Sequence, residues 1–106
     1  MKRVMVQYKV KVDRADENVR FIEGVFAQLA SERPEGLRYA SFKLADGRSF
    51  VHLASIETAD GSNPLAALAA FRAFVSAIAD RCEVPPSTAE LHEVGAYRLF
   101  GAETSA

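Results

Sequence analysis

The chain has 106 residues, of which 49% are hydrophobic and 25% charged, values that predict one globular domain over residues 1–106 and exclude a disordered chain. Its 13 basic and 14 acidic residues leave a net charge of −1, so the positive surplus that nucleic-acid binding needs is absent. The longest apolar stretch, residues 65–71, is too short to span a bilayer, and a single cysteine without a recognisable signal peptide predicts a cytoplasmic location.

The first predicted element is a strand near the N-terminus. Apolar side chains occupy every second position, at Val4, Val6, Tyr8, Val10 and Val12. A period of two with several β-branched residues is typical of a strand that is buried on one side. We therefore expect the even-numbered face to be buried and the odd-numbered face to be more polar.

A helix is predicted next, with Asp13 as its N-cap and the segment 34–36 (Pro-Glu-Gly) as its end. Asp16 and Glu17 would lie in the first turn, where the helix dipole favours negative charge. Helical spacing produces one apolar stripe, formed by Val19, Ile22, Val25, Phe26 and Leu29. Gly24 is costly inside a helix, which suggests a close packing contact at that position.

Two strands follow, over 37–45 and 49–57, and Asp46-Gly47 between them predicts a two-residue hairpin turn. Such a turn would fix the register of the two strands. The expected pairs are Ser41 with His52, Tyr39 with Ala54 and Lys43 with Phe50. The other face of the hairpin would carry Ala40, Phe42, Leu44, Val51 and Leu53.

The last predicted elements are a helix and a strand. Asn63 can cap the helix with Pro64 in its first position, and Pro85-Pro86 would stop it. The apolar stripe of this helix consists of Leu65, Leu68, Phe71, Val75 and Ile78. A fourth strand is predicted over 88–100, with Gly95 as a bulge or close-contact point.

The order strand, helix, strand, strand, helix, strand predicts the fold. It indicates an α+β, ferredoxin-like βαββαβ sandwich, in which a four-stranded antiparallel sheet carries two helices on one face. The other sheet face would be bare and would expose alternating apolar residues. Because such a patch is unusual on a monomer, we expect two copies to pair sheet face to sheet face as a homodimer.

With these elements in place, the chain resembles the dimeric α+β barrel superfamily, and within it the antibiotic-biosynthesis-monooxygenase-like branch. The matching features are Pro-Glu-Gly-Leu-Arg-Tyr at 34–39, Ser-Phe-Val-His-Leu at 49–53, Asn-Pro-Leu at 63–65, and the aromatic residues Phe71 and Phe74. The resemblance covers residues 3–100. It implies a dimeric α+β barrel, but the oxygenating members of the superfamily share no short catalytic motif.

The resemblance also implies a range of activities. Some members oxygenate phenolic substrates without metal or flavin, some degrade haem, and others isomerise or cyclise small molecules. The haem-degrading members use a helical histidine ligand and a tryptophan, whereas this chain has no Trp and no His in either predicted helix. We therefore expect no cofactor.

His52 is the predicted catalytic residue. It lies in the middle of an apolar strand, where burial would lower its pKa and favour the neutral imidazole. A neutral imidazole near Ser41 and Tyr39 could act as a general base on an acidic phenol or enol. The alternative is a histidine that only packs and forms hydrogen bonds within the sheet or at a dimer interface.

Other side chains could line a pocket or carry chemistry. The predicted ligand-binding residues are Tyr8, Tyr39, Ser41, Phe71 and Phe74. The alternative for the tyrosines and phenylalanines is a structural role in the core. Ser41 lacks the exposed turn and oxyanion hole of a hydrolase nucleophile. His92 is expected on the surface. A metal site is not predicted, because the sequence offers no third ligand at motif spacing beside the two histidines. Cys82, flanked by Asp80 and Glu83, is expected to be an inert thiol with a raised pKa.

Two functional hypotheses remain open from the sequence. The first is a cofactor-independent, monooxygenase-like enzyme or proton-transfer catalyst that acts on a small, partly aromatic metabolite, with His52 as base and Tyr39 or Ser41 orienting the substrate. The second is a non-catalytic ligand-binding or interaction module built around the dimer interface. A cavity beside His52 large enough for a ring would favour the first, and a fully packed interior the second. A regulatory subunit of a larger enzyme is a third idea.

Overall fold

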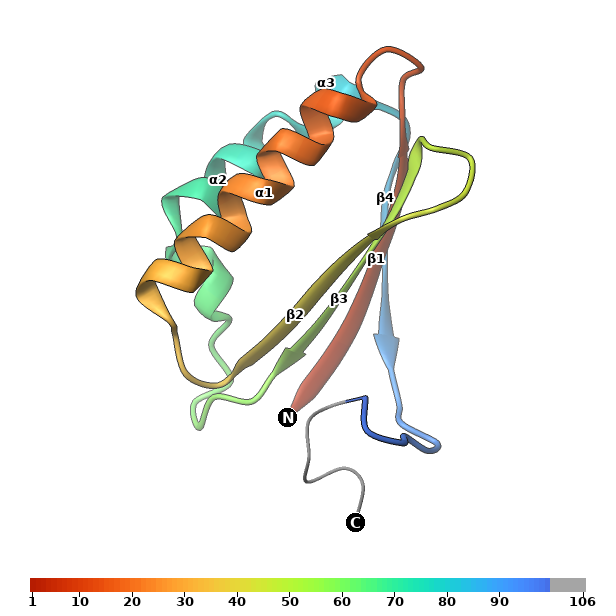
Figure 1. Ribbon diagram of the computed structural model, residues 1–106. Helices are drawn as coiled ribbons and strands as arrows, with labels where there is room; N and C mark the ends of the chain where they lie inside the picture. The colour runs from red at the N-terminus through yellow and green to blue at the C-terminus, as the bar shows by residue number, and fades with distance from the viewer. Residues whose placement is uncertain (100–106) are drawn as a thin grey trace.

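Residues 1–99 are described by the computed structural model, in which helices cover one face of a four-stranded antiparallel sheet (Figure 1). The elements in chain order are strand β1 (Lys2–Val10), helix α1 (Ala15–Glu32), strands β2 (Leu37–Lys43) and β3 (Ser49–Ile56), the 3-10 helix η1 (Pro64–Ala67), helices α2 (Ala69–Ser76) and α3 (Ile78–Arg81), and strand β4 (Cys82–Leu91). The sheet order is β2-β3-β1-β4. The predicted α+β, ferredoxin-like fold is therefore confirmed. Phe100 of the predicted fourth strand and the remainder up to 106 lie outside the described residues.

Strand β1 confirms the predicted alternation over most of its length. On its even-numbered side, Tyr8 and Val10 are buried beneath the helices. They form the main hydrophobic core together with Val25, Phe50, Leu65, Leu68 and Phe74. The prediction is wrong for Val12, which is 76% exposed because β1 already ends at Val10.

Helix α1 begins later than predicted, and Asp13 does not cap it. Arg14 occupies the N-cap position, makes no side-chain cap hydrogen bond, and instead pairs with Glu17 one turn further on. The predicted apolar stripe is confirmed, since Val25 is buried and Val19, Ile22 and Leu29 pack against the core. Phe26, the remaining member of the stripe, stacks on Tyr39. The close contact expected at Gly24 is wrong, because this glycine is exposed and nothing lies within 4 Å of the place of a Cβ.

Gly36 and Gly24 offer a matched pair of stability tests. Gly36 has a φ of 78°, and a Cβ there would lie 2.7 Å from Cγ2 of Thr58. We expect Gly36→Ala to lower the free energy of unfolding by about 1–3 kcal/mol. Gly24→Ala should raise it by about 1 kcal/mol, because alanine favours the helix and the site is open. Urea denaturation at one protein concentration measures both changes, and a stabilised Gly36→Ala variant would contradict the expectation.

The hairpin between β2 and β3 has the predicted register but a longer turn. Ser41 pairs with His52, Tyr39 with Ala54 and Lys43 with Phe50, as expected. Backbone pairing ends where the Leu44 amide donates to the Ser49 carbonyl, so the two-residue turn predicted at Asp46-Gly47 is wrong. The carboxylate of Asp46 accepts hydrogen bonds from the backbone amides of Arg48 (2.9 Å) and Ser49 (2.8 Å), which closes the longer loop.

The second helical region is broken into η1, α2 and α3 rather than forming one helix. Asn63 caps it as predicted, because its side chain accepts a hydrogen bond from the Leu65 amide (3.0 Å). The backbone then becomes extended at Leu68, which is buried, whereas Val75 of the predicted apolar stripe is 46% exposed. None of the described helices has the length and apolar character needed to cross a membrane.

Strand β4 starts earlier than the predicted range of 88–100. Pro85 and Pro86, expected to stop a helix, lie inside this strand instead. A proline cannot donate to a β-ladder, but β4 is an edge strand, and its register with β1 shifts between Gln7 and Lys9, opposite the prolines. Gly95, the predicted bulge, follows the end of the strand.

The sheet face opposite the helices, which we call the open face, is apolar along its centre. One row of directly paired residues crosses all four strands and consists of Ala40, Leu53, Met5 and Ala89. Paired residues of antiparallel strands project from the same face. Adjacent rows add Phe42, which is 52% exposed, and Leu91, which is 36% exposed. The bare apolar face predicted from the sequence is therefore present.

Candidate functional site

A cavity of about 230 Å³ lies between the helix-covered side of the sheet and α2. Most of its lining is apolar and includes Val4, Val6, Leu65, Phe71, Phe74 and Ile78. The sheet wall adds the polar side chains Tyr8, Tyr39 and His52. A dry cavity of about 150 Å³ can hold benzene, so this one has room for an aromatic ring or a somewhat larger molecule.

The sheet register brings the polar groups together around His52. Ser41 lies directly opposite His52 on β2, and Tyr39 and Tyr8 come from the neighbouring rows of β2 and β1. Nδ1 of His52 lies 2.7 Å from Oγ of Ser41 and 2.9 Å from the Tyr39 hydroxyl. Nε2 lies 2.8 Å from the Tyr8 hydroxyl. The predicted site residues Tyr8, Tyr39, Ser41 and His52 thus form one cluster. The predicted Phe71 and Phe74 also line the cavity, and the ring of Phe74 packs against that of His52.

Burial sets the protonation of this cluster. His52 is 4% exposed, and its burial lowers the pKa of the imidazole to about 4. Burial also raises the pKa of Tyr8 and of Tyr39, although hydrogen bonds with Asn18 and Ser41 act in the opposite direction. At physiological pH the imidazole and both phenols are therefore neutral.

Asn18 of α1 and Arg81 of α3 complete the cluster, and sequence reasoning missed both. Each is fully buried. Nδ2 of Asn18 donates to the Tyr8 hydroxyl (2.8 Å), and Nε of Arg81 donates to Oδ1 of Asn18 (3.1 Å). Asn18 lies four residues before Ile22, and Arg81 three residues after Ile78, so each occupies a position of an apolar stripe. A polar residue at such a position is the signal that could have identified them.

The guanidinium of Arg81 lies between two aromatic rings. Its Cζ is 4.3 Å from the ring centroid of Phe21 and 5.3 Å from that of Phe74, and Nη2 donates to the carbonyl of Phe74 (3.1 Å). Within residues 1–99, its Nη1 is the buried side-chain polar atom that lacks a hydrogen-bond partner. Burial lowers the pKa of Arg81, but an arginine keeps its charge in proteins. A fixed positive charge therefore lies behind Asn18.

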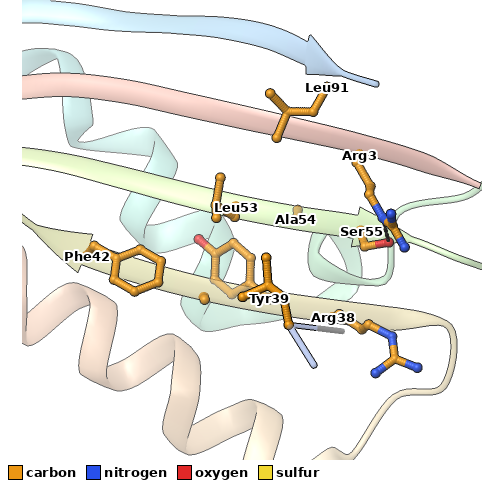
Figure 2. A pocket seen from close by; sticks show the side chains of 10 residues that line it. Arg3, Arg38, Tyr39, Phe42, Leu53, Ala54, Ser55 and Leu91 are labelled. Atoms are coloured by element: carbon orange, nitrogen blue, oxygen red, sulfur yellow. Dashed lines mark hydrogen bonds between the residues drawn. The ribbon is translucent and has the colours of Figure 1, made fainter. Parts of the chain in front are cut away.

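A second hollow, of about 190 Å³, lies on the open face (Figure 2). Its apolar lining includes Phe42, Leu53 and Leu91. At one end, Nε of Arg3 donates to Oγ of Ser55 (3.1 Å), and Arg3 also pairs with Glu93. Arg38 pairs with Glu57 at 3.2 Å. The hollow belongs to the surface that the predicted dimer would cover.

The other predicted residues lie away from the cavity. Ser41 is not part of its lining, and its hydroxyl contacts His52 and Tyr39. His92 follows the end of β4 and is exposed, as expected. In the part of the chain that the structure describes, no group of three His, Cys, Asp or Glu side chains could hold a metal ion. The pKa of Cys82 is raised as predicted, but by burial and not by the neighbouring acids.

Comparison with known proteins supports the fold. No protein-family model and no curated protein matches the chain. A solved structure named "Putative antibiotic biosynthesis monooxygenase from Nitrosomonas europaea" is similar with a TM-score of 0.73 and 20% identity, over 89% of this chain and 99% of that chain. A structure named "Crystal structure of antibiotic biosynthesis monooxygenase" is similar with a TM-score of 0.72 and 17% identity, over 89% of this chain and 99% of that chain.

A conserved protein from Methanosarcina mazei Go1 is also similar, with a TM-score of 0.70 and 12% identity, over 87% of this chain and 91% of that chain. At these identities the likeness concerns the fold, and it extends over almost the whole length of each relative. The resemblance found in the sequence is therefore confirmed at the level of the fold: this chain folds as proteins named antibiotic biosynthesis monooxygenases do.

Proposed function

We propose that the chain forms a homodimer in which each subunit binds a small, partly aromatic metabolite in the cavity beside His52 and oxygenates it without a cofactor. The observation that carries this proposal is the cavity itself: its walls are apolar except for His52, the hydroxyls of Tyr8 and Tyr39 in contact with it, and Asn63. Cavities of this kind are typical of small-molecule sites. The names of the similar structures support the same reaction class. The cytoplasmic location stays a prediction.

The chemistry would begin with a proton. His52 is neutral at physiological pH because burial lowers its pKa to about 4. As a general base it would remove the proton of a phenolic or enolic hydroxyl, with the surrounding hydroxyls orienting the ligand. The resulting anion is electron-rich. At the ring carbon para to its oxygen, which is a CH₂ group in the keto form, the ligand can reduce dioxygen without another electron donor, since one oxygen atom becomes the new carbonyl and the other leaves as water.

A non-catalytic binding module is the second candidate, and one observation favours it. Both ring nitrogens of His52 already have partners within the chain, on Tyr8, Tyr39 and Ser41. A histidine whose hydrogen bonds are all satisfied can have a purely structural role, in which it holds the sheet and the cavity wall together. Such a protein would bind the same ligands without converting them.

A binding experiment tests the cavity. We expect 1-naphthol to bind the wild-type chain in calorimetric titration, and Val75→Trp to weaken binding at least about tenfold, because an indole at this lining position fills the cavity. Val12→Trp is the matched control, since Val12 is also exposed but lies outside the lining. Equal affinities for the two variants, or no binding to the wild type, would remove the cavity from the proposal.

An activity experiment separates the two candidates. The experiment follows dioxygen uptake with an oxygen electrode and 1-naphthol as probe. If the protein is an enzyme, we expect uptake by the wild type at a rate that falls about 100-fold in His52→Ala. The binding module predicts no uptake by either protein. Uptake that is unchanged in His52→Ala would remove His52 from the chemistry.

A further inference from the structure

A continuous chain of hydrogen bonds runs from α3 through α1 and β1 to β3. It links Arg81 Nε to Asn18 Oδ1 (3.1 Å), Asn18 Nδ2 to the Tyr8 hydroxyl (2.8 Å), and that hydroxyl to His52 Nε2 (2.8 Å). Each of these four side chains is at most 4% exposed. Because the chain is shielded from water, the proton positions in it are decided by its own members.

The direction of these hydrogen bonds follows from Arg81. A guanidinium can only donate, so the Asn18 atom that faces it must be the amide oxygen. The amide nitrogen of Asn18 therefore faces Tyr8 and donates to its oxygen. Because the Tyr8 oxygen accepts from Asn18, its hydroxyl proton points to His52, and Tyr8 donates to Nε2.

This direction fixes the tautomer of His52. Nε2 accepts from Tyr8 and must carry the lone pair, so in the neutral ring the proton lies on Nδ1. The oxygens of Ser41 and Tyr39, at 2.7 and 2.9 Å, can accept that proton. In the opposite tautomer, the Tyr8 oxygen would face two N–H donors, and its own proton would lose the acceptor it has here.

We propose that Tyr8 is the hydroxyl through which His52 takes a proton from the bound ligand, and that Asn18 and Arg81 are positioning residues that hold this path in one direction. The proposal rests on the proposed function and deepens it. Tyr8 borders the cavity and is hydrogen-bonded to the basic nitrogen of His52. Tyr39 also borders the cavity, but it contacts Nδ1, which already carries a proton and cannot accept another.

The step consists of two coupled proton transfers, from the ligand to Tyr8 and from Tyr8 to His52. The O–H bond of a phenolic or enolic ligand breaks as a new O–H bond forms on Tyr8, while the original Tyr8 proton forms the new N–H bond on Nε2. The products are the ligand anion and an imidazolium. The new N–H can donate to Tyr8, and the Nδ1 N–H still donates to Ser41 or Tyr39, so the cation has acceptors on both sides. The ligand class is therefore a weak oxygen acid on an apolar ring.

The tautomer is measured directly by long-range ¹H–¹⁵N NMR of the full chain at neutral pH. We expect the ring signals of His52 to show a protonated Nδ1 and an unprotonated Nε2. The exposed His92 supplies an internal reference for a solvated imidazole. This measurement needs neither ligand nor turnover, and a His52 ring protonated on Nε2 would overturn the proposal.

The substitution Asn18→Asp should reverse the direction of the hydrogen bonds between residue 18, Tyr8 and His52, with almost no change in side-chain size. A carboxylate can only accept, so Tyr8 would have to donate to it and would accept from Nε2 of His52 instead. We expect the tautomer of His52 to switch to Nε2–H in this variant and to remain Nδ1–H in Tyr39→Phe, where Ser41 still accepts from Nδ1. An unchanged tautomer in Asn18→Asp would overturn the role of Asn18. If this variant does not fold, the His52 tautomer in the wild-type spectrum still tests the proposal.

The role of Tyr8 needs a second readout. With 1-naphthol as probe, we expect Tyr8→Phe to lower kcat for dioxygen uptake about 100-fold and Tyr39→Phe less than about tenfold. Binding of naphthalene, which has no proton to give, should be similar in both variants. Equal kcat losses would overturn the role of Tyr8. A wild-type chain with the expected tautomer that does not bind 1-naphthol would show instead that the proposed function has failed, and the Tyr8 path with it.

Discussion

The free energy of unfolding is expected to fall by about 3 kcal/mol as the pH is lowered from 6.5 to about 4, because of His52. Burial places the pKa of the folded imidazole at about 4, below the ordinary value of 6.5. Between these values the unfolded chain binds a proton that the folded chain does not, so stability decreases as pH falls. The stabilisation is fully present above pH 6.5 and is lost once the pH reaches the folded pKa.

The surroundings of His52 support this direction. The titratable side chains in contact with it are Tyr8 from β1 and Tyr39 from β2, whose pKa values are raised, so both stay neutral in this range. From α2 the neutral ring of Phe74 packs against the imidazole at 5.4 Å between centroids. Neither the phenols nor this ring offers a negative charge that would stabilise the imidazolium.

Urea denaturation at a series of pH values measures the effect, and two histidine variants provide its controls. His52→Gln should flatten the profile above pH 4.5, whereas His92→Gln should leave it steep, because His92 is exposed. Carboxylates such as Glu57, whose pKa is lowered mainly by its hydrogen bond from Ser55, lose stabilisation in the same direction but only at lower pH. Parallel profiles for wild type and His52→Gln would contradict the assignment.

The sequence was sufficient to predict the fold because its strongest signals are local. Period-two alternation predicts β1. The short hairpin loop between β2 and β3 allows a single register, which places His52 opposite Ser41. Even the wrong turn at Asp46-Gly47 did no harm, since the longer loop keeps the same pairs. Strand β4 was misplaced because Pro85 and Pro86 are breakers in most contexts, and only their position on a sheet edge makes them acceptable.

The candidate site was predicted only where the sheet alone determines it. Tyr8, Tyr39 and His52 share the helix-covered face by strand alternation, which the sequence shows. Asn18 and Arg81 lie on helices, so their distance from Tyr8 depends on how α1 and the broken second helical region pack on the sheet. That packing is a tertiary property without a local signal, and the direction of the hydrogen bonds depends on it in turn.

The open face leads to the second large effect. We expect the wild-type chain to sediment as a dimer at micromolar concentration, because the row through Ala40, Leu53 and Met5 and the exposed Phe42 form a continuous apolar surface. Leu53→Glu should raise the dimer dissociation constant at least about 100-fold, since it would bury a carboxylate of each subunit in the apolar row. In a two-fold symmetric interface the substitution also acts twice.

Val12→Glu is the matched control for this experiment. Val12 is exposed, but it lies beyond the end of β1 and outside the open face. The control should therefore remain a dimer, and circular dichroism of both variants would show that the helices and the sheet are retained. The cavity beside His52 lies on the other side of the sheet from the open face, so Leu53→Glu should still bind 1-naphthol if the cavity is complete within one subunit. A wild-type chain that sediments as a stable, folded monomer at micromolar concentration would contradict the sheet-to-sheet dimer, because the apolar row would then remain in water without a partner.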